Sequence, residues 1–459
     1  MSARCRSAAS NGLTPGECDV LEEVVRSLEQ TTPLDGLKAV EPLLDRLSQI
    51  QPPLQSPSEP SRAKALADLQ QWFAKSNPSG GTDQTWSLSA DVNGVKACRD
   101  LPAGSTFITV PKSMMVMATE PTIAIDAVCE KIPSVALTLQ LIHERRVGGE
   151  SRFAAYIASL PALGSTELDA AAFWPISQIK TALEPTTAYS GAIRTRLSTV
   201  QHYVYLVGYV VLPPGFTRLS WAEWSWASAI VLSRQNSIVP GTLALIPCWD
   251  MANHDPNGCR SFYNEDGNVL VSETSSSVAA DDQIFINYGC RPAWQLVVYQ
   301  GFVGSSSDCG SSLMRAALND LQQPRDDIVK LRSMLLEKRD IANADMQVGG
   351  DGSVPDALLW AARINSLDRE SAAIALRNPN ASSVSPANER AALLSLFYVL
   401  STRLEDREAV CKQNAPGMGA VPERRAHVAK MLTSMEISTL RKTIGWIQAR
   451  IAECGNTGK

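Results

Sequence analysis

The chain has 459 residues and a mass of 49.6 kDa, enough for two to four domains with a large buried core. Hydrophobic residues make up 44% of it and charged residues 19%, which excludes a disordered chain or a disulfide-stabilised miniature protein. The 42 basic residues are outnumbered by 47 acidic ones, so no excess of positive charge exists to hold a phosphate backbone. We therefore expect no nucleic acid partner.

The cysteines and histidines indicate no metal site. The ten cysteines lie far apart, no two at C-x₂-C spacing, and the four histidines include no i, i+4 pair. We expect reduced thiols in a cytoplasmic protein, with the nucleus as the alternative location. No apolar run is long enough to cross a bilayer, so no membrane is expected either.

Residues 1–61 are expected to form a helical segment followed by a proline-rich linker. Apolar residues recur there at helical spacing: Leu21, Val24, Val25 and Leu28. The stretch QPPLQSPSEPS at residues 51–61 holds four prolines, too many for a helix interior. Arg62 then stands near the start of a further helix.

Strands are predicted on both sides of a helical insertion at about residues 122–235. Residues 104–117 are rich in β-branched and large apolar side chains and follow a turn signal, which predicts a strand. Within the insertion the apolar spacing is helical, as in residues 135–146. Short apolar runs bounded by Asp, Asn or Gly predict small strands at residues 243–246, 269–271 and 284–287.

Beyond about residue 310 almost every segment has helical periodicity. Loops are expected at residues 349–356 and 378–389. The last helix is the clearest, because its apolar residues step by 4, 3 and 4: Leu440, Ile444, Ile447 and Ile451. No repeat of 20–50 residues is evident.

Polar side chains gather at two predicted strand ends. Within RQNSIVPGTLALIPCWDMANH (residues 234–254), Asn253 and His254 follow an apolar strand, and Tyr288 follows a second strand in QIFINYG. Strand ends hold backbone geometry fixed and are common places for binding sites. On residue types alone, a turn closed by Asn253 and His254 is the alternative interpretation.

An N-H pair after one strand and Y-G after another, about 30 residues later, resembles the two signature motifs of SET-domain protein methyltransferases. The resemblance covers most of the chain, including RDLPAGSTFITVPKSMM (99–115), ESRFAAYIASLP (150–161), LALIPCWDMANHDPNG (243–258) and FINYGCR (285–291). The long insertion, the helical tail and the lack of cysteine clusters are similar to the group that contains Rubisco lysine methyltransferase and the actin-histidine methyltransferase.

The resemblance implies an α+β fold with three parts. Residues 1–61 would be the N-terminal helical segment and linker, and residues 62–310 a SET β-core of small sheets with its helical insertion. Residues 311–459 would be an all-α substrate-binding domain of the Rubisco-methyltransferase type.

The resemblance also implies S-adenosylmethionine as cofactor and no metal. Arg62 and Arg234 match the family's cofactor-binding arginines, and guanidinium forks hold a carboxylate bidentately. The segment that contacts the cofactor matches Asp250, Met251, Ala252, Asn253 and His254. The glycine-rich entry DVNGVKA supplies Asp91 and Asn93, and the closing glycine–aromatic pair is Gly301 and Phe302.

The methyl-accepting pocket is assigned to Asn236, Trp249 and Tyr288 as catalytic and substrate-binding residues, with Arg291 contacting the substrate peptide. In lysine-modifying relatives the position of Asn236 tends to be aromatic and that of Trp249 small, whereas this pairing matches histidine-methylating members. A carboxamide oxygen can accept a hydrogen bond from one imidazole N–H and so orient the other nitrogen. The indole offers an apolar ring to a planar target.

Two segments depart from the family pattern. The usual Y-G-x-R-S-N-x-E appears as YGCRPAWQ, and Asn93 stands where an aromatic residue often meets the adenine. We expect altered cofactor affinity with activity retained. The prediction is a monomeric protein-histidine methyltransferase acting on actin; the alternatives are a Rubisco-type lysine methyltransferase and a catalytically silent SET-like binding module.

Overall fold

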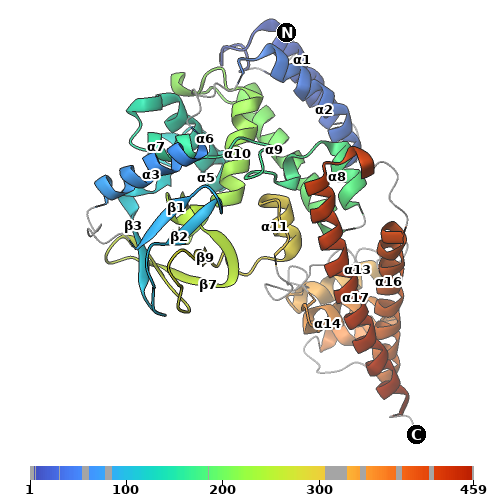
Figure 1. Ribbon diagram of the computed structural model, residues 1–459. Coiled ribbons are helices and arrows are strands. Elements are labelled where there is room, and N and C mark those ends of the chain that lie inside the picture. The colour runs from blue at the N-terminus through green and yellow to red at the C-terminus, as the bar shows by residue number, and fades with distance from the viewer. Residues whose placement is uncertain are drawn as a thin grey trace. The chain divides into compact units, whose positions relative to one another are not determined.

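The computed structural model describes residues 5, 7–29, 32–53, 61–77, 85–184, 186–304, 328–341, 348–378, 385–412 and 418–456 (Figure 1). These residues form two compact units. The first comprises residues 1–179, 191–289 and 298–302, and the second residues 180–190, 290–297 and 303–459. Most of the proline-rich linker, residues 54–60, lies outside the described residues.

The strands belong to the first unit and are short, with one exception. They are β1 (Trp86–Ser89), β2 (Gly94–Ala97), β3 (Thr106–Pro111), β4 (Val116–Met117), β5 (Asn236–Val239), β6 (Thr242–Leu245), β7 (Asn253–Asn264), β8 (Val269–Glu273) and β9 (Gln283–Ile286). The predicted strand at 104–117 is thus two strands, β3 and β4, separated by a 3₁₀ turn at Lys112–Met114. The small strands expected near 243, 269 and 284 are confirmed as β6, β8 and β9.

The strands pair into two small sheets. One has the order β1-β2-β9-β7-β8-β3 and the other β4-β6-β5. Every pairing is antiparallel except β7 with β9, which places Asn253 opposite Phe285 and His254 opposite Ile286. The start of β7 therefore lies against the end of β9, directly before Tyr288.

The helices fall into three groups along the chain. The N-terminal ones are α1 (Pro15–Leu28), α2 (Pro33–Ile50) and α3 (Arg62–Ser76). Between β4 and β5 lie α4 (Glu120–Ile123), α5 (Ala127–Lys131), α6 (Pro133–Val147), α7 (Ala154–Ser159), α8 (Ile176–Leu183), α9 (Thr187–Tyr209) and α10 (Trp221–Arg234). After β9 come α11 (Ala293–Tyr299), α13 (Ile328–Lys338), α14 (Asp356–Asn365), α15 (Arg369–Arg377), α16 (Pro386–Lys412) and α17 (Glu423–Asn456).

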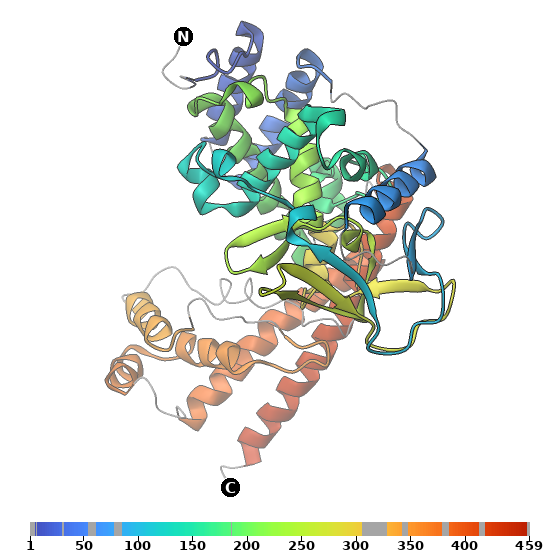
Figure 2. The same ribbon diagram turned by 90° about the vertical axis from the view of Figure 1, so that its left-hand side faces the viewer.

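Small sheets, inserted helices and a helical C-terminal region confirm the α+β class. The loop predicted at residues 378–389 ends earlier than expected, because α16 already begins at Pro386. In both ribbon views α3 lies beside β1 (Figures 1 and 2), where the Leu88 N–H donates to Gln70 Oε1 at 2.9 Å. This contact fixes the helix that begins at Arg62 against the first hairpin.

The first N-terminal helix packs into the first unit rather than standing apart from it. Thr14 and Glu17 form a capping box that starts α1. The buried Asn11 amide donates to the carbonyls of Val207 at 3.0 Å and Val210 at 2.7 Å and accepts from the Leu212 N–H at 2.8 Å. Three hydrogen bonds from one buried amide tie the start of the chain to the end of α9.

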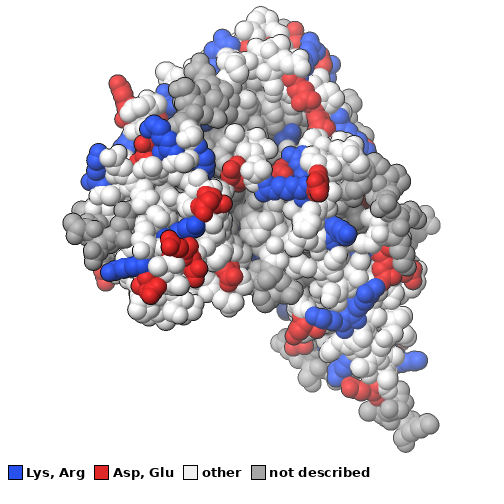
Figure 3. Space-filling view, in the orientation of Figure 1, with Lys and Arg blue, Asp and Glu red and all other residues white. Residues whose placement is uncertain are grey.

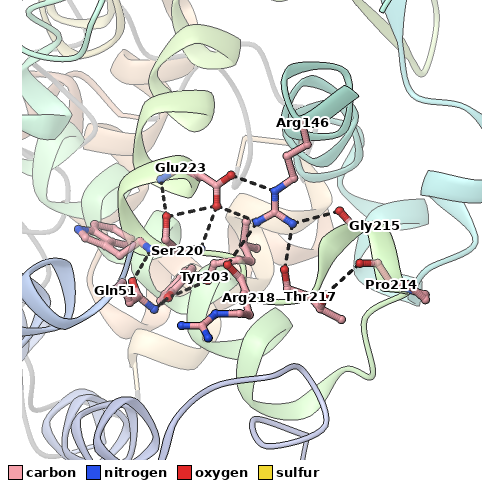
Figure 4. Close-up of polar contacts among 11 residues, drawn as sticks. Gln51, Arg146, Tyr203, Pro214, Gly215, Thr217, Arg218, Ser220 and Glu223 are labelled. Atoms are coloured by element: carbon pink, nitrogen blue, oxygen red, sulfur yellow. Dashed lines mark hydrogen bonds and ion pairs between the residues drawn. The ribbon is translucent and has the colours of Figure 1, made fainter. Parts of the chain in front are cut away.

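A half-buried polar network joins α6 to the start of α10 (Figure 4). Arg146 donates two hydrogen bonds to the Glu223 carboxylate, from Nε at 2.9 Å and from Nη2 at 2.7 Å. Its Nη1 donates to the carbonyls of Gly215 and Thr217 at 3.0 Å each. Glu223 in turn completes a capping box with Ser220. Burial opposes ionisation, but the Arg146 guanidinium and the Ser220 groups outweigh it and lower the pKa of Glu223.

The cysteines depart in one place from the expected reduced thiols. Eight are free: Cys5, Cys18, Cys98, Cys129, Cys248, Cys259, Cys411 and Cys454. Cys290 is disulfide-bonded, so the prediction was wrong for this residue. Among the described residues, no helix is both long and apolar enough to cross a membrane.

Replacing Glu223 by Gln is expected to lower the free energy of unfolding by about 2 kcal/mol at pH 7, because two charge-assisted hydrogen bonds to Arg146 are lost. The pKa of Glu223 is lowered by folding, so its contribution is complete above the unfolded value. It begins to fall as the pH drops below the unfolded value of about 4.3 and is lost as the pH falls through the lowered folded value. Urea unfolding of both proteins at pH 7 and pH 3.5 measures this.

The matched control is Asp68→Asn, which breaks the exposed ion pair with Lys64 at 2.7 Å. An exposed pair of this kind contributes less than about 1 kcal/mol. Equal losses in the two variants, or a Glu223→Gln loss independent of pH, would contradict the assignment.

Candidate functional site

The paired ends of β7 and β9 are anchored by the Asn253 amide. Its Nδ2 donates to the Gln283 side chain of β9 at 2.8 Å and to the Val92 carbonyl in the β1–β2 turn at 3.2 Å. A Cβ at Gly94 would lie 2.8 Å from this nitrogen, so only glycine lets the turn approach. Asn253 therefore joins three segments that are far apart in the sequence.

His254 and Tyr288 lie face to face beyond these strand ends. Their rings are 4.9 Å apart at an angle of 29°. The Tyr288 N–H lies 3.1 Å from His254 Nδ1, and the same nitrogen lies 3.4 Å from the Ile286 carbonyl oxygen. The two segments that carry the family resemblance, N-H and Y-G, are therefore in contact in the structure.

The Tyr288 hydroxyl and the Phe302 ring complete the aromatic cluster. Tyr288 donates to the Ala252 carbonyl at 2.8 Å. The Phe302 ring lies 6.2 Å from His254 and 6.4 Å from Tyr288, edge-on to the tyrosine. Gly301 has a φ of +81°, and a Cβ there would lie 2.4 Å from the Asp169 carbonyl oxygen. Only glycine can hold Phe302 at this point.

Arg62 and Asn93 are paired through the guanidinium fork. Asn93 Oδ1 accepts from Arg62 Nε at 3.3 Å and from Nη2 at 2.9 Å, and Nη1 donates to the Ser159 carbonyl. Three of the five N–H groups are thereby used within the described chain, which leaves two for an incoming acceptor.

Arg234 lies at the end of α10 with its side chain only 13% exposed. Nη1 donates to the Asp250 carbonyl at 2.6 Å and lies 3.6 Å from Met251 Sδ. The Asp250 carboxylate is 3.8 Å away and itself buried. Burial raises the pKa of Asp250 to about 6, although Arg234 and Tyr156 lower it.

The two arginines lie close enough for their charges to interact. Burial and the charge of Arg234 both lower the pKa of Arg62, and only Glu167 opposes them. The Nε of Arg234 is buried with no hydrogen-bond partner in the described chain. Two desolvated guanidiniums with unused donors fit a carboxylate, which accepts bidentate hydrogen bonds.

Asn236 and Trp249 lie in different elements, the strand β5 and the 3₁₀ turn at Trp249–Met251. Asn236 begins β5, and its Nδ2 donates to the Arg234 carbonyl at 3.0 Å, while no described residue donates to its Oδ1. Trp249 is 4% exposed, and its indole N–H donates to Ser261 at 3.0 Å. The indole can therefore offer a neighbour only the apolar part of its ring.

Asp91 is not brought into this cluster. Asp91 is exposed and pairs with Lys96 at 2.6 Å, which lowers the pKa of Asp91. Arg291 belongs to the second unit and is half-buried. The roles assigned to both from the sequence stay predictions.

A cavity of about 490 Å³ opens beside Arg62, between α3, α6, α7 and α10. Arg62 is the one predicted site residue in its wall, which also includes Glu144, Arg145, Glu167 and Trp226. The described residues contain no group of three or more His, Cys, Asp or Glu side chains placed to hold a metal ion.

Sequence reasoning missed Tyr156 as part of the site, although its segment was recognised as similar to the family. The side chain is fully buried in α7, and its hydroxyl donates to Asp250 at 2.5 Å. The sequence around a tyrosine in an apolar helix does not indicate which distant residue its hydroxyl will contact. β7 was also missed, because HDPNG resembles a turn and forms a bulge in which His254 and Cys259 both face Ile286.

No model of a known protein family matches the chain. Over 278 residues the chain is 25% identical to the actin-histidine N-methyltransferase of Mus musculus. This aligned region covers 57% of the chain and 46% of the mouse protein. The Danio rerio actin-histidine N-methyltransferase is 23% identical over 320 residues, covering 64% and 53%. The chain thus spans about half the length of the curated relatives it matches.

Solved structures show the fold. The SET domain of LSMT bound to lysine and AdoHcy superposes with a TM-score of 0.69 at 18% identity, covering 86% of this chain and 93% of that one. Rubisco LSMT bound to AdoMet gives 0.65 at 18% identity, with 87% and 93% covered. The chain has the SET-domain fold, which confirms the resemblance seen in its motifs.

Proposed function

We propose that the chain, on its SET-domain fold, is an S-adenosylmethionine-dependent protein-histidine N-methyltransferase that acts on actin. The likeness to actin-histidine N-methyltransferases and to AdoMet-bound LSMT supports methyl transfer. The observation that carries the cofactor assignment is the pair of desolvated arginines with unused donors, Arg62 and Arg234. We further propose that it acts as a cytoplasmic monomer.

When bound, S-adenosylmethionine supplies an activated methyl group on a sulfonium. Arg62 and Arg234 would hold its carboxylate, and the ring of Phe302 beside His254 would close the site. Tyr288 would shape the channel to the target, since its hydroxyl is held by the Ala252 carbonyl. These oxygens favour positive charge nearby.

The pocket supports an imidazole target over an amine. Asn236 Oδ1 receives no hydrogen bond from the described chain and suits the N–H of a neutral imidazole, leaving the second ring nitrogen free to attack. An imidazole with a pKa near 6.5 is largely neutral at pH 7, whereas a lysine near 10.4 must first lose a proton. Positioning two reactants then supplies most of the rate.

Surface charge is consistent with a protein substrate. On the face drawn in Figure 3, basic and acidic residues are interspersed and no broad single-sign field appears. The formal net charge of the whole chain is −5.

Incubation with methyl-labelled cofactor and actin tests the function. We expect label on actin at a histidine, and none on an actin variant in which that histidine is Ala. Labelling of a lysine would favour the Rubisco-type alternative. Failure of the protein to bind S-adenosylmethionine in calorimetry would favour the silent module.

Replacing Tyr288 by Phe is expected to slow methyl transfer at least about tenfold while cofactor affinity changes little, because the hydroxyl acts near the developing charge. Single-turnover rates and calorimetric titrations separate the two effects. Tyr263→Phe is the control, since this β7 tyrosine bonds only to Asn268 at 3.3 Å. An unchanged rate in the Tyr288 variant would remove its assigned role.

Exchanging Asn236 for Phe and Trp249 for Ala together is expected to shift preference from histidine toward lysine, because an apolar sleeve replaces an amide acceptor and a flat wall. The measurement compares methylation of two peptides that differ only at the target position, which is histidine in one and lysine in the other. Removing the buried indole also costs about 3–5 kcal/mol, so melting temperature is recorded alongside. Ser261→Ala controls for loss of the indole anchor. Retained histidine selectivity in the folded double variant would refute the pocket assignment.

A further inference from the structure

Three side chains from separate elements meet in the interior behind the candidate site. Tyr156 of α7 is fully buried and donates to Asp250 Oδ2 at 2.5 Å. Asp250, in the 3₁₀ turn at Trp249–Met251, is 6% exposed. Its Oδ1 lies 3.8 Å from Arg234 Nη1, and its main-chain carbonyl accepts from the same nitrogen at 2.6 Å.

The trio is electrostatically incomplete. Asp250 Oδ1 and Arg234 Nε are both buried without a hydrogen-bond partner among the described residues. The Arg234–Asp250 ion pair is long, at 3.8 Å. Among the described residues, Tyr156 supplies the only side-chain hydrogen bond that the Asp250 carboxylate accepts. A charged carboxylate buried with so few partners is costly to maintain.

The balance of these forces leaves Asp250 mostly ionised at physiological pH but only about one pH unit above its midpoint. Burial raises its pKa to about 6, while Arg234 and then the Tyr156 hydrogen bond lower it. The other titratable neighbour, the thiol of Cys248, has its own pKa raised well above the usual range by burial and by Asp250, so it stays neutral. Burial likewise raises the pKa of Tyr156, which keeps its phenol a donor.

We propose that Tyr156 is a positioning residue of the cofactor site, one that holds the Asp250 carboxylate ionised and thereby fixes the Arg234 guanidinium. This rests on the proposed function, in which Arg234 binds the cofactor carboxylate. Tyr156 acts through Asp250 and touches no reacting group. Phenylalanine would fill the same space in α7 and lose only the hydroxyl.

The expected consequence follows from the hydrogen bond to the charged form. Without the phenol, the Asp250 carboxylate loses its side-chain donor, so its pKa rises further. A hydrogen bond to a charged group corresponds to about one to two pH units. The pH at which Arg234 gains or loses its ionised partner therefore moves upward by that amount.

The test is the pH dependence of S-adenosylhomocysteine binding, measured by calorimetry from pH 5 to pH 9. In the unaltered protein the affinity is expected to change with a midpoint near pH 6. In Tyr156→Phe the midpoint should move up by about one to two units. Tyr203→Phe is the matched control, because its phenol is equally buried and bonded, to Gln51 at 2.9 Å, but in a remote network.

The outcomes are distinct. The inference is supported if the midpoint of the pH dependence rises in Tyr156→Phe and does not change in Tyr203→Phe. It is overturned if both variants lose the same melting temperature while both midpoints stay unchanged, because the Tyr156 hydrogen bond is then only structural. Asp250→Asn, where it folds, should give a flat profile. If the unaltered protein does not bind S-adenosylhomocysteine at any pH, the proposed function fails, which is a different result from a fixed midpoint.

Discussion

The parallel pairing of the start of β7 with the end of β9 is the constraint on which the site depends. Because Asn253 faces Phe285 and His254 faces Ile286, the residues after one strand and those opening another meet at one point. The pairing is short, and Asn253 reinforces it by bonding both β9 and the β1–β2 turn. A one-residue slip would turn both polar side chains to the other face of the sheet. The His254–Tyr288 stack and the Arg62–Asn93 fork both depend on this register.

Asn93 shows how a departure from a family pattern can preserve a site. An aromatic ring was expected there to meet the cofactor, and its loss suggested weakened affinity. The residue sits at a φ of 44°, a left-handed conformation that asparagine tolerates and bulky residues avoid. From it the carboxamide oxygen accepts two hydrogen bonds from Arg62. Asn93 thereby fixes the orientation of the Arg62 guanidinium.

The sequence could predict what local pattern encodes and little of what depends on long-range contact. The helix at α6, the short strands β6, β8 and β9, and the grouping of Asn253, His254 and Tyr288 followed from periodicity and motif. The long strand β7 could not, since its Asp-Pro-Asn-Gly bulge is stabilised by pairing with β9 rather than by propensity. Tyr156 was equally hidden, because its partner lies 94 positions away. Asp91 was selected by motif position, yet the structure leaves it exposed to solvent and pairs it with Lys96.

Under the proposed function, the hydrogen bonds that Trp249 and Asn236 already make would determine which target fits beside them. The indole N–H of Trp249 is used by Ser261, whose hydroxyl lies 2.7 Å from that of Ser272, so the ring presents no donor to a guest. The Asn236 amide is anchored through Nδ2 to the Arg234 carbonyl, which leaves its oxygen as the acceptor. A target with one N–H and one lone pair on a flat ring satisfies this arrangement, whereas an ammonium brings three donors to a single acceptor. The carbonyl that anchors Asn236 belongs to Arg234, so one residue would join the proposed substrate side to the proposed cofactor side, and displacing that arginine would disturb both.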